Sequence, residues 1–258
     1  MSSPPPTMND LKTSAQEQLE YMLTEDDDAP LLTADNEIKV EARECMKKLF
    51  TRFNSLVESL LCESKESVSN AEKLQPFQSY LADLLWACQI LAKLEIMREL
   101  VSHWVEASEH ILKVLQLVSL EAAMLEMKLK VIEVTTKVSE AIGYGTVILP
   151  TAKRLHMVRI WLPHVRALKP LMDSSTNDVE DVLKMDGELW QSLESAFVSI
   201  ILTLPSLDQA EILSDWLGNK DIRYPDLTEA IEVWCYRSKV ANKRLAYLGG
   251  THGMARML

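Results

Sequence analysis

The sequence has few of the residues on which most catalytic and metal-binding motifs are built. Its 258 residues include seven glycines and five histidines, and its four cysteines form no CxxC pair. It contains no GxSxG elbow, kinase signature, Walker lysine or HExxH helix, the patterns that place a nucleophile, a phosphate or a zinc ion. The sequence therefore names no catalytic, cofactor-binding or metal-ligating residue and no cofactor, and we expect a protein that is not an enzyme. Because two of the cysteines lie in apolar helical rows, reduced, buried thiols are expected at Cys45, Cys62, Cys88 and Cys235.

Positive charge and long apolar runs are scarce as well. The formal net charge of −11 opposes a general nucleic-acid role, because phosphate binding depends on clustered Lys and Arg. The longest apolar run, Ala196 to Leu204, is about half of the ~20 residues that a membrane-spanning helix needs. The first ten residues lack the apolar stretch of a secretory signal. We expect an intracellular protein of the cytoplasm or nucleus that binds neither membrane nor nucleic acid.

Two weak metal-site signals favour structural explanations. His103 and His110 are too far apart for the i and i+4 pair of a helical zinc site, and no further ligands converge on them. They are expected to be surface or boundary histidines. The acidic run Glu25 to Asp28 lacks the glycine and the distant glutamate of an EF-hand, so it is expected to be a solvated linker.

Apolar residues recur with helical period instead. Between Leu120 and Ala141 one apolar row follows alternating spacings of four and three, and a second row that includes Leu125 and Ile132 widens it. A two-stranded coiled coil needs only the narrow row. We therefore favour an intramolecular core over a dimer seam. Similar segments along the chain predict an all-α fold, a multi-helix array of stacked antiparallel helices with no sheet.

Breaks in this periodicity divide the chain. We expect a disordered lead over residues 1–10, N-terminal acidic helices over 11–63, a C-terminal helical domain over 71–248 and a frayed tail over 249–258. Asp35 can cap the long helix before the break at Glu63 to Asn70. After that break, separate helices are expected over residues 77–94, 95–108, 109–118 and 186–201, with a last one over 225–245. Since proline disfavours helix at the residue before it, Pro163 should split residues 151–169 into two short helices.

Two local motifs are expected to end and begin helices. Gly143 follows the apolar seam, where a left-handed C-cap is usual, and a structural turn is favoured over a nucleotide loop because the GxG follows a helix and lacks a third glycine. Ser206 to Gln209 has the outline of a capping box, which would start a helix at Leu207.

The tryptophans and one basic segment are the remaining candidates for recognition. Trp86, Trp104 and Trp234 lie on apolar helix faces and are expected to be core anchors, not ligand platforms. The segment from Lys153 to Lys169 has no acidic residue. We favour a solvated face that complements the acidic segment from Asp173 to Glu194, over a site for an acidic partner or RNA.

The amino-acid sequences of several segments resemble those of a known family. The resemblance is to the C-terminal helical region of plant BTB/POZ domain-containing proteins, and it covers roughly Phe77 to Leu248. The segments that carry it are LLWACQIL (Leu84 to Leu91), VIEVTTKVSEAIGYGTVILP (Val131 to Pro150), VRIWLPHVRALKPLMDS (Val158 to Ser174), SAFVSIILTLPSLDQAEILSDWL (Ser195 to Leu217) and RYPDLTEAIEVWCYRS (Arg223 to Ser238).

The resemblance implies an adaptor function. In such proteins the BTB domain docks a cullin of an E3 ubiquitin ligase and the helical part receives another protein. No BTB pattern of alternating short strands and helices precedes the helical region here, so a cullin is expected only indirectly or through a longer form. The leading hypothesis is a protein-binding helical domain of the ubiquitination pathway whose partner is another protein. The alternatives are a structural or self-associating helical scaffold, which would form a homo-oligomer, and a small-ligand or RNA binder that uses the basic segment.

Overall fold

The chain is built from helices alone throughout the part that its computed structural model describes, which is residues 7–23, 36–62, 71–118, 122–175, 186–218 and 224–251. These residues form nine α-helices and no strand, which confirms the predicted fold class. The helices are α1 (Met8–Leu23), α2 (Asn36–Cys62), α4 (Ala71–Lys93), α5 (Met97–Leu117), α6 (Ala122–Gly143), α7 (Thr151–Ser175), α8 (Asp186–Leu202), α9 (Ser206–Gly218) and α10 (Thr228–Thr251).

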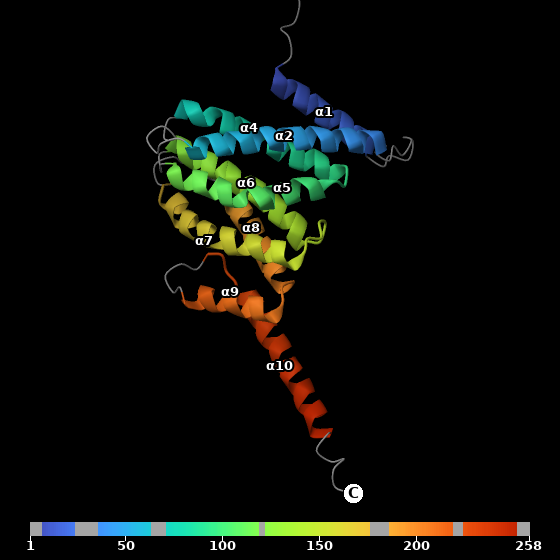
Figure 1. The fold of residues 1–258 in the computed structure, drawn as a ribbon, viewed down its shortest axis with the longest axis vertical. Coiled ribbons are helices and arrows are strands. Elements are labelled where there is room, and N and C mark those ends of the chain that lie inside the picture. Colours follow the sequence, from blue (N-terminus) through green and yellow to red (C-terminus); the bar gives the residue numbers. More distant parts are fainter. Residues whose placement is uncertain are drawn as a thin grey trace, which may run out of the picture.

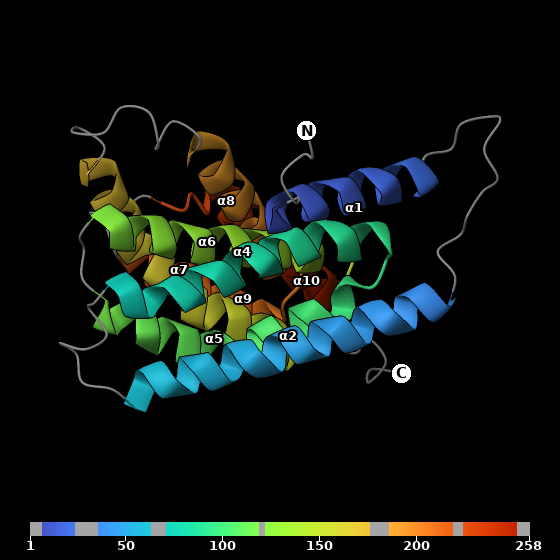
Figure 2. The ribbon, with the colours of Figure 1, turned by 90° about the horizontal axis from the view of Figure 1, so that it is seen from above.

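The helices are stacked in layers along the long axis of the molecule, from α1 at one end to α10 at the other (Figure 1). Helices α2 and α4 pack on α5 and α6, which in turn pack on α7 and α8, and α10 packs on α8 and α9. Seen from above, α4 lies between α1 and α2 (Figure 2). Each layer therefore makes its main contacts with the layers next to it, and α1 covers one end of the stack.

One hydrophobic core runs from α2 to the start of α10. The apolar row predicted for α6 is part of it, since Met127, Val131, Val134 and Val138 are fully buried, and so is Ile132 of the second row. This burial confirms an intramolecular core in place of a dimer seam. Phe53 of α2 stacks on Trp104 of α5, so α2 shares this core although it precedes the break. The division into an N-terminal and a C-terminal helical part stays a prediction.

Two predicted helix breaks are wrong. The expected boundary between Ser108 and Glu109 is absent, because buried side chains continue with helical period through one helix, α5. Helix α7 also runs without interruption past Pro163. Pro163 and Arg159, whose carbonyl the proline leaves without an N–H donor, are both exposed, so water can satisfy that carbonyl.

The predicted left-handed glycine is also misplaced. Gly143 is the last residue of α6, and the positive φ of 82° belongs to Gly145. Gly143 is needed for a different reason, because a Cβ built there would lie 2.8 Å from the carbonyl oxygen of Ala196 in α8. Its missing side chain thus lets α6 and α8 approach closely.

A non-glycine residue ends α4 in the left-handed region. Glu95 has a φ of 58°. Its N–H bonds the Ala92 carbonyl at 3.1 Å, and the N–H of Ile96 bonds the Leu91 carbonyl at 2.9 Å. This pair of bonds is a Schellman motif, in which glycine is the usual residue. The backbone of Glu95 is therefore strained, and the turn that it forms directs α5 back along α4.

The capping box predicted at the start of α9 does not form. The Gln209 side chain donates from Nε2 to the Leu204 carbonyl at 2.6 Å. Its Oε1, which would have to accept from the Ser206 N–H, has no partner in the part of the chain described here. Helix α9 nevertheless begins at Ser206, one residue before the expected start.

Several predictions concern residues outside the described ranges. They are the Asp35 cap, the acidic run Glu25 to Asp28, the break at Glu63 to Asn70, residues 1–6 of the lead and residues 252–258 of the tail. The predicted lead and tail also overlap helices, because α1 begins at Met8 and α10 extends to Thr251. Within the described ranges, no helix is long and apolar enough to span a membrane.

Candidate partner-binding groove

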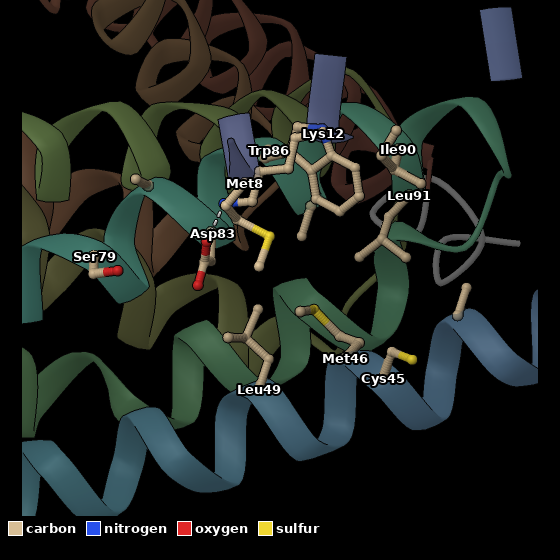
Figure 3. Close-up of a pocket in the computed structure, with 13 residues that line it drawn as sticks. Met8, Lys12, Cys45, Met46, Leu49, Ser79, Asp83, Trp86, Ile90 and Leu91 are labelled. Carbon is tan, nitrogen blue, oxygen red and sulfur yellow. Dashed lines mark hydrogen bonds and ion pairs between the residues drawn. The ribbon is translucent and has the colours of Figure 1, made fainter. Parts of the chain in front are cut away.

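A groove lies between α1 and α2, with α4 as its floor (Figure 3). Its volume is about 760 Å³. Most of the side chains that line it are apolar, and its only charged lining residues in the described chain are Lys12 and Asp83. The lining residues are Met8 and Lys12 of α1, Ala42, Cys45, Met46 and Leu49 of α2, and Ser79, Ala82, Asp83, Trp86, Ala87, Ile90 and Leu91 of α4.

Trp86 lines this groove, and its predicted role as a core anchor is wrong. The side chain is only partly buried, and the indole lies between Lys12 of α1 and Ile90 of its own helix (Figure 3). Trp104, in contrast, is fully buried as predicted. Trp234 is intermediate, since it packs against the core but its Nε1 donates to the Ser206 carbonyl at 3.1 Å. Among these three tryptophans, Trp86 is the one whose ring faces a groove.

One ion pair joins α1 to α4. Lys12 Nζ contacts Asp83 Oδ1 of α4, and the two side chains are 26% and 33% exposed. No described side chain of α1 is buried, and Met8, Leu11 and Tyr21 are 68%, 51% and 77% exposed. An amphipathic helix of this kind normally derives its stability from burying its apolar face. The described side chains of α1 therefore contribute little buried apolar area at this end of the stack.

A second hollow borders the other side of α1. Its volume is about 470 Å³, and Gln16 of α1 lines it together with Cys88 of α4, Lys137 of α6 and Tyr144 in the turn after α6. Close-packed protein interiors hold few voids larger than a water molecule. Hollows on both sides of α1 show that its shape does not fill the surface on which it lies.

The basic segment is neutralised by neighbouring helices. Its cations bond acidic side chains of α5, α9 and α7 itself and the carbonyl of Thr203, just after α8, which is the pairing that a structural face predicts. Most of these partners lie outside the acidic segment that we had expected, whose described residues (173–175 and 186–194) contribute Asp173. The contacts are Lys153 to Glu106 (2.8 Å), Arg154 to the Thr203 carbonyl (3.2 Å), Arg159 to Glu211 (2.5 Å), Arg166 to Asp215 (3.9 Å) and Lys169 to Asp173.

The histidines are distributed among separate environments. His103 lies against the ring of Phe50, with a centroid separation of 5.1 Å, and His110 is exposed. His164 is largely buried beside Trp161, and burial, followed by the positive charge of Lys128, lowers its pKa to about 4. In the described ranges no three His, Cys, Asp or Glu side chains are grouped so that they could hold a metal ion.

The cysteines are less buried than the sequence predicted. Only Cys88 is buried, and desolvation raises its pKa to about 12, so it stays a protonated thiol at neutral pH. Cys45, Cys62 and Cys235 are exposed. Cys45 lies in an apolar row of α2 whose later member Phe53 is buried in the core, but the part of the row at Cys45 and Leu49 borders the groove.

Fold and groove together define a class of protein, an all-α array of stacked helices with an apolar groove at one end. The chain is 56% identical over 254 residues to the BTB/POZ domain-containing protein At3g05675 of Arabidopsis thaliana. It is 27% identical over 197 residues to the BTB/POZ domain-containing protein At3g50780 of the same plant. This similarity confirms the predicted resemblance to plant BTB/POZ domain-containing proteins.

The match covers nearly all of this chain but only part of each relative. It includes 96% of the chain and 57% of the first relative, and 74% of the chain and 35% of the second. No family model matches the sequence. No solved structure matches it either.

The groove was missed by sequence reasoning because no local pattern encodes it. Lys12 and Asp83 are 71 residues apart, and the third wall comes from α2. The only signal in the sequence was Lys12, a cation that lies next to the apolar row of α1 that includes Leu11 and Ala15.

Proposed function

We propose that this chain is the partner-binding helical part of a BTB-type adaptor that presents another protein to a cullin-based E3 ubiquitin ligase in the cytoplasm or nucleus. The observation that carries the proposal is the 56% identity to a BTB/POZ domain-containing protein over 96% of the chain. In this role the chain acts by binding and not by catalysis. The apolar groove beside α1 supports that role, because recognition of a protein segment needs an accessible apolar surface with few charges.

The cullin contact is assigned to a BTB domain and not to these helices. The purified chain should therefore show no saturable binding to a purified cullin N-terminal domain, whereas a fusion with an upstream BTB domain should bind it. Direct, saturable binding by the chain alone would contradict this division of labour.

The delivery step is tested in cells. Proteins biotinylated by a proximity-labelling enzyme fused to the chain should include at least one whose abundance rises when cullin activation is inhibited. That rise should disappear when an excess of the unfused chain competes for the partner. If no labelled protein responds to cullin inhibition, the ubiquitin role is wrong.

A self-associating scaffold is the second candidate, and the exposed length of α10 favours it. Tyr236 is 70% exposed, and the described side chains from Tyr236 to Arg244 include none that is buried. Light scattering across a concentration series distinguishes the two functions. A constant monomer mass supports the adaptor, and a mass that rises with concentration supports the scaffold.

A further inference from the structure

The groove beside α1 has the features of a site for a helix that α1 fills only in part. Met46 and Leu49 of α2 form one wall, and Trp86 and Ile90 of α4 project from the floor (Figure 3). Met8, the apolar residue that α1 contributes, is 68% exposed. The width of the groove therefore exceeds what α1 covers.

The charge in the groove specifies one feature of its occupant. Asp83 is the single anionic lining residue in the described chain, and it sits among apolar side chains. An unpaired carboxylate on such a floor favours a cation, and α1 supplies Lys12. Any helix that replaces α1 needs a lysine or arginine at the equivalent position.

Exchange is feasible because the described contacts between α1 and the stack are weak. A partly exposed ion pair contributes about 0–1 kcal/mol, and no described side chain of α1 is buried. A 16-residue helix is marginal in water when it lacks tertiary packing. The tether to α2 keeps α1 at a high local concentration, and this is the main obstacle that a competitor must overcome.

We propose that α1 is an exchangeable cover, and that the groove takes an amphipathic helix of a partner protein whose lysine or arginine replaces Lys12 on Asp83. This inference rests on the proposed function, because it names where the adaptor takes its partner and what that partner presents. The mode is a helix in a groove, read through apolar residues and one ion pair.

The test uses the full chain and a fluorescein-labelled peptide of residues 7–23 as a surrogate for the partner helix. Lys12→Glu in the chain places two carboxylates together and should loosen the built-in α1. Fluorescence anisotropy should then show roughly 10-fold tighter peptide binding than the wild-type chain gives, the change expected when one ion pair becomes a repulsion. Lys113→Glu, an exposed site on α5, is the matched control and should bind the peptide as the wild type does.

A charge exchange makes the test specific. The Asp83→Lys chain should reject the wild-type peptide and bind a peptide that carries Lys12→Glu, whereas the Lys12→Glu chain should show the opposite preference. Circular dichroism of each variant establishes that the stack is folded. If neither peptide distinguishes the two chains, the groove is not a helix site and the inference is overturned.

Light scattering distinguishes a partner helix from a second copy. The Lys12→Glu chain should remain monomeric, because its own α1 no longer fits any copy of the groove. A dimer of the wild-type chain that Lys12→Glu abolishes would show that α1 is exchanged between copies, and would overturn the assignment to a partner. None of these measurements involves a cullin, so a failure of the ubiquitin role leaves their outcome unaffected, and their failure leaves the cullin experiments standing.

Discussion

Trp161 of α7 donates a hydrogen bond from its indole Nε1 to Ser108 Oγ of α5 at 2.9 Å, and both side chains are fully buried. Ser108 Oγ in turn donates to the carbonyl of Trp104 at 2.7 Å. The two indoles are nearly parallel, with centroids 6.2 Å apart. One serine hydroxyl therefore satisfies the only polar atom of the Trp161 side chain and connects the layer of α5 to the layer of α7.

Ser108→Ala should lower the free energy of unfolding by about 1–3 kcal/mol, because it leaves the buried N–H of Trp161 without an acceptor. Chemical denaturation measures the change. Ser55→Ala is the matched control, since Ser55 makes the same bond to the carbonyl four residues earlier but is exposed, and its effect should stay within about 0.5 kcal/mol. Trp161→Phe should lower the free energy of unfolding less in the Ser108→Ala background than in the wild type. Purely additive losses of the two substitutions would contradict the coupling between Trp161 and Ser108.

Gly143→Ala should destabilise the protein by about 1–3 kcal/mol, because the new methyl group would press on the Ala196 carbonyl and separate α6 from α8. Gly145→Ala should cost about 1 kcal/mol for a different reason, its left-handed backbone. Gly187→Ala meets open space at the start of α8 and serves as the control, with no loss expected. Equal midpoints of thermal unfolding for all three variants would contradict both assignments.

Glu95→Gly should raise the stability, against the usual effect of introducing glycine. The substitution removes the strain of a side chain at a φ of 58°, which costs roughly 1–2 kcal/mol, and this gain exceeds the entropy that glycine adds to the unfolded chain. Glu95→Val should lower it, because a β-branched residue tolerates this region least. A loss of stability in the glycine variant would mean that the Glu95 side chain makes a compensating contact.

His164 should make the protein less stable as the pH falls from about 6.5 to about 4. Its folded pKa of about 4 lies below the ordinary value of 6.5, so the unfolded chain binds a proton in this range and the folded chain does not. The contribution of neutral His164 to the free energy of unfolding is fully present above pH 6.5. It is lost progressively on acidification, with a total on the order of 3 kcal/mol. His164→Gln should flatten the pH dependence of the unfolding free energy over this range. His110→Gln, at an exposed site, should leave the slope unchanged.

The helical segments could be predicted from the sequence because their signal is local. The apolar row of α6 was read correctly, since Met127, Val131 and Val134 follow one face whatever packs on it. The prediction at Pro163 was wrong because the local rule assumes that the freed carbonyl must be buried or bonded within the helix, whereas Pro163 and Arg159 are exposed and water can satisfy it.

Burial at the end of the stack could not be predicted in this way. Trp86 and Cys45 lie in apolar rows as regular as those of the core, yet both border the groove. Whether an apolar face is covered depends on how well the neighbouring helix fits it, and a groove remains between α1 and α2. The groove also requires Lys12, Asp83 and α2 to come together over a long stretch of sequence, and periodicity contains no information about such contacts.

The layered arrangement sets a gradient of amide exchange along the molecule. Helix α6 packs against α4, α5, α7 and α8, so its amide hydrogens should exchange only on global unfolding. Helix α1 and the outer part of α10 have a neighbour on one side at most over much of their length and should exchange first (Figure 1). An event that detaches α1 would then leave the protection of α8 unchanged, so the two ends of the stack can respond to separate binding events without transmitting strain through the centre.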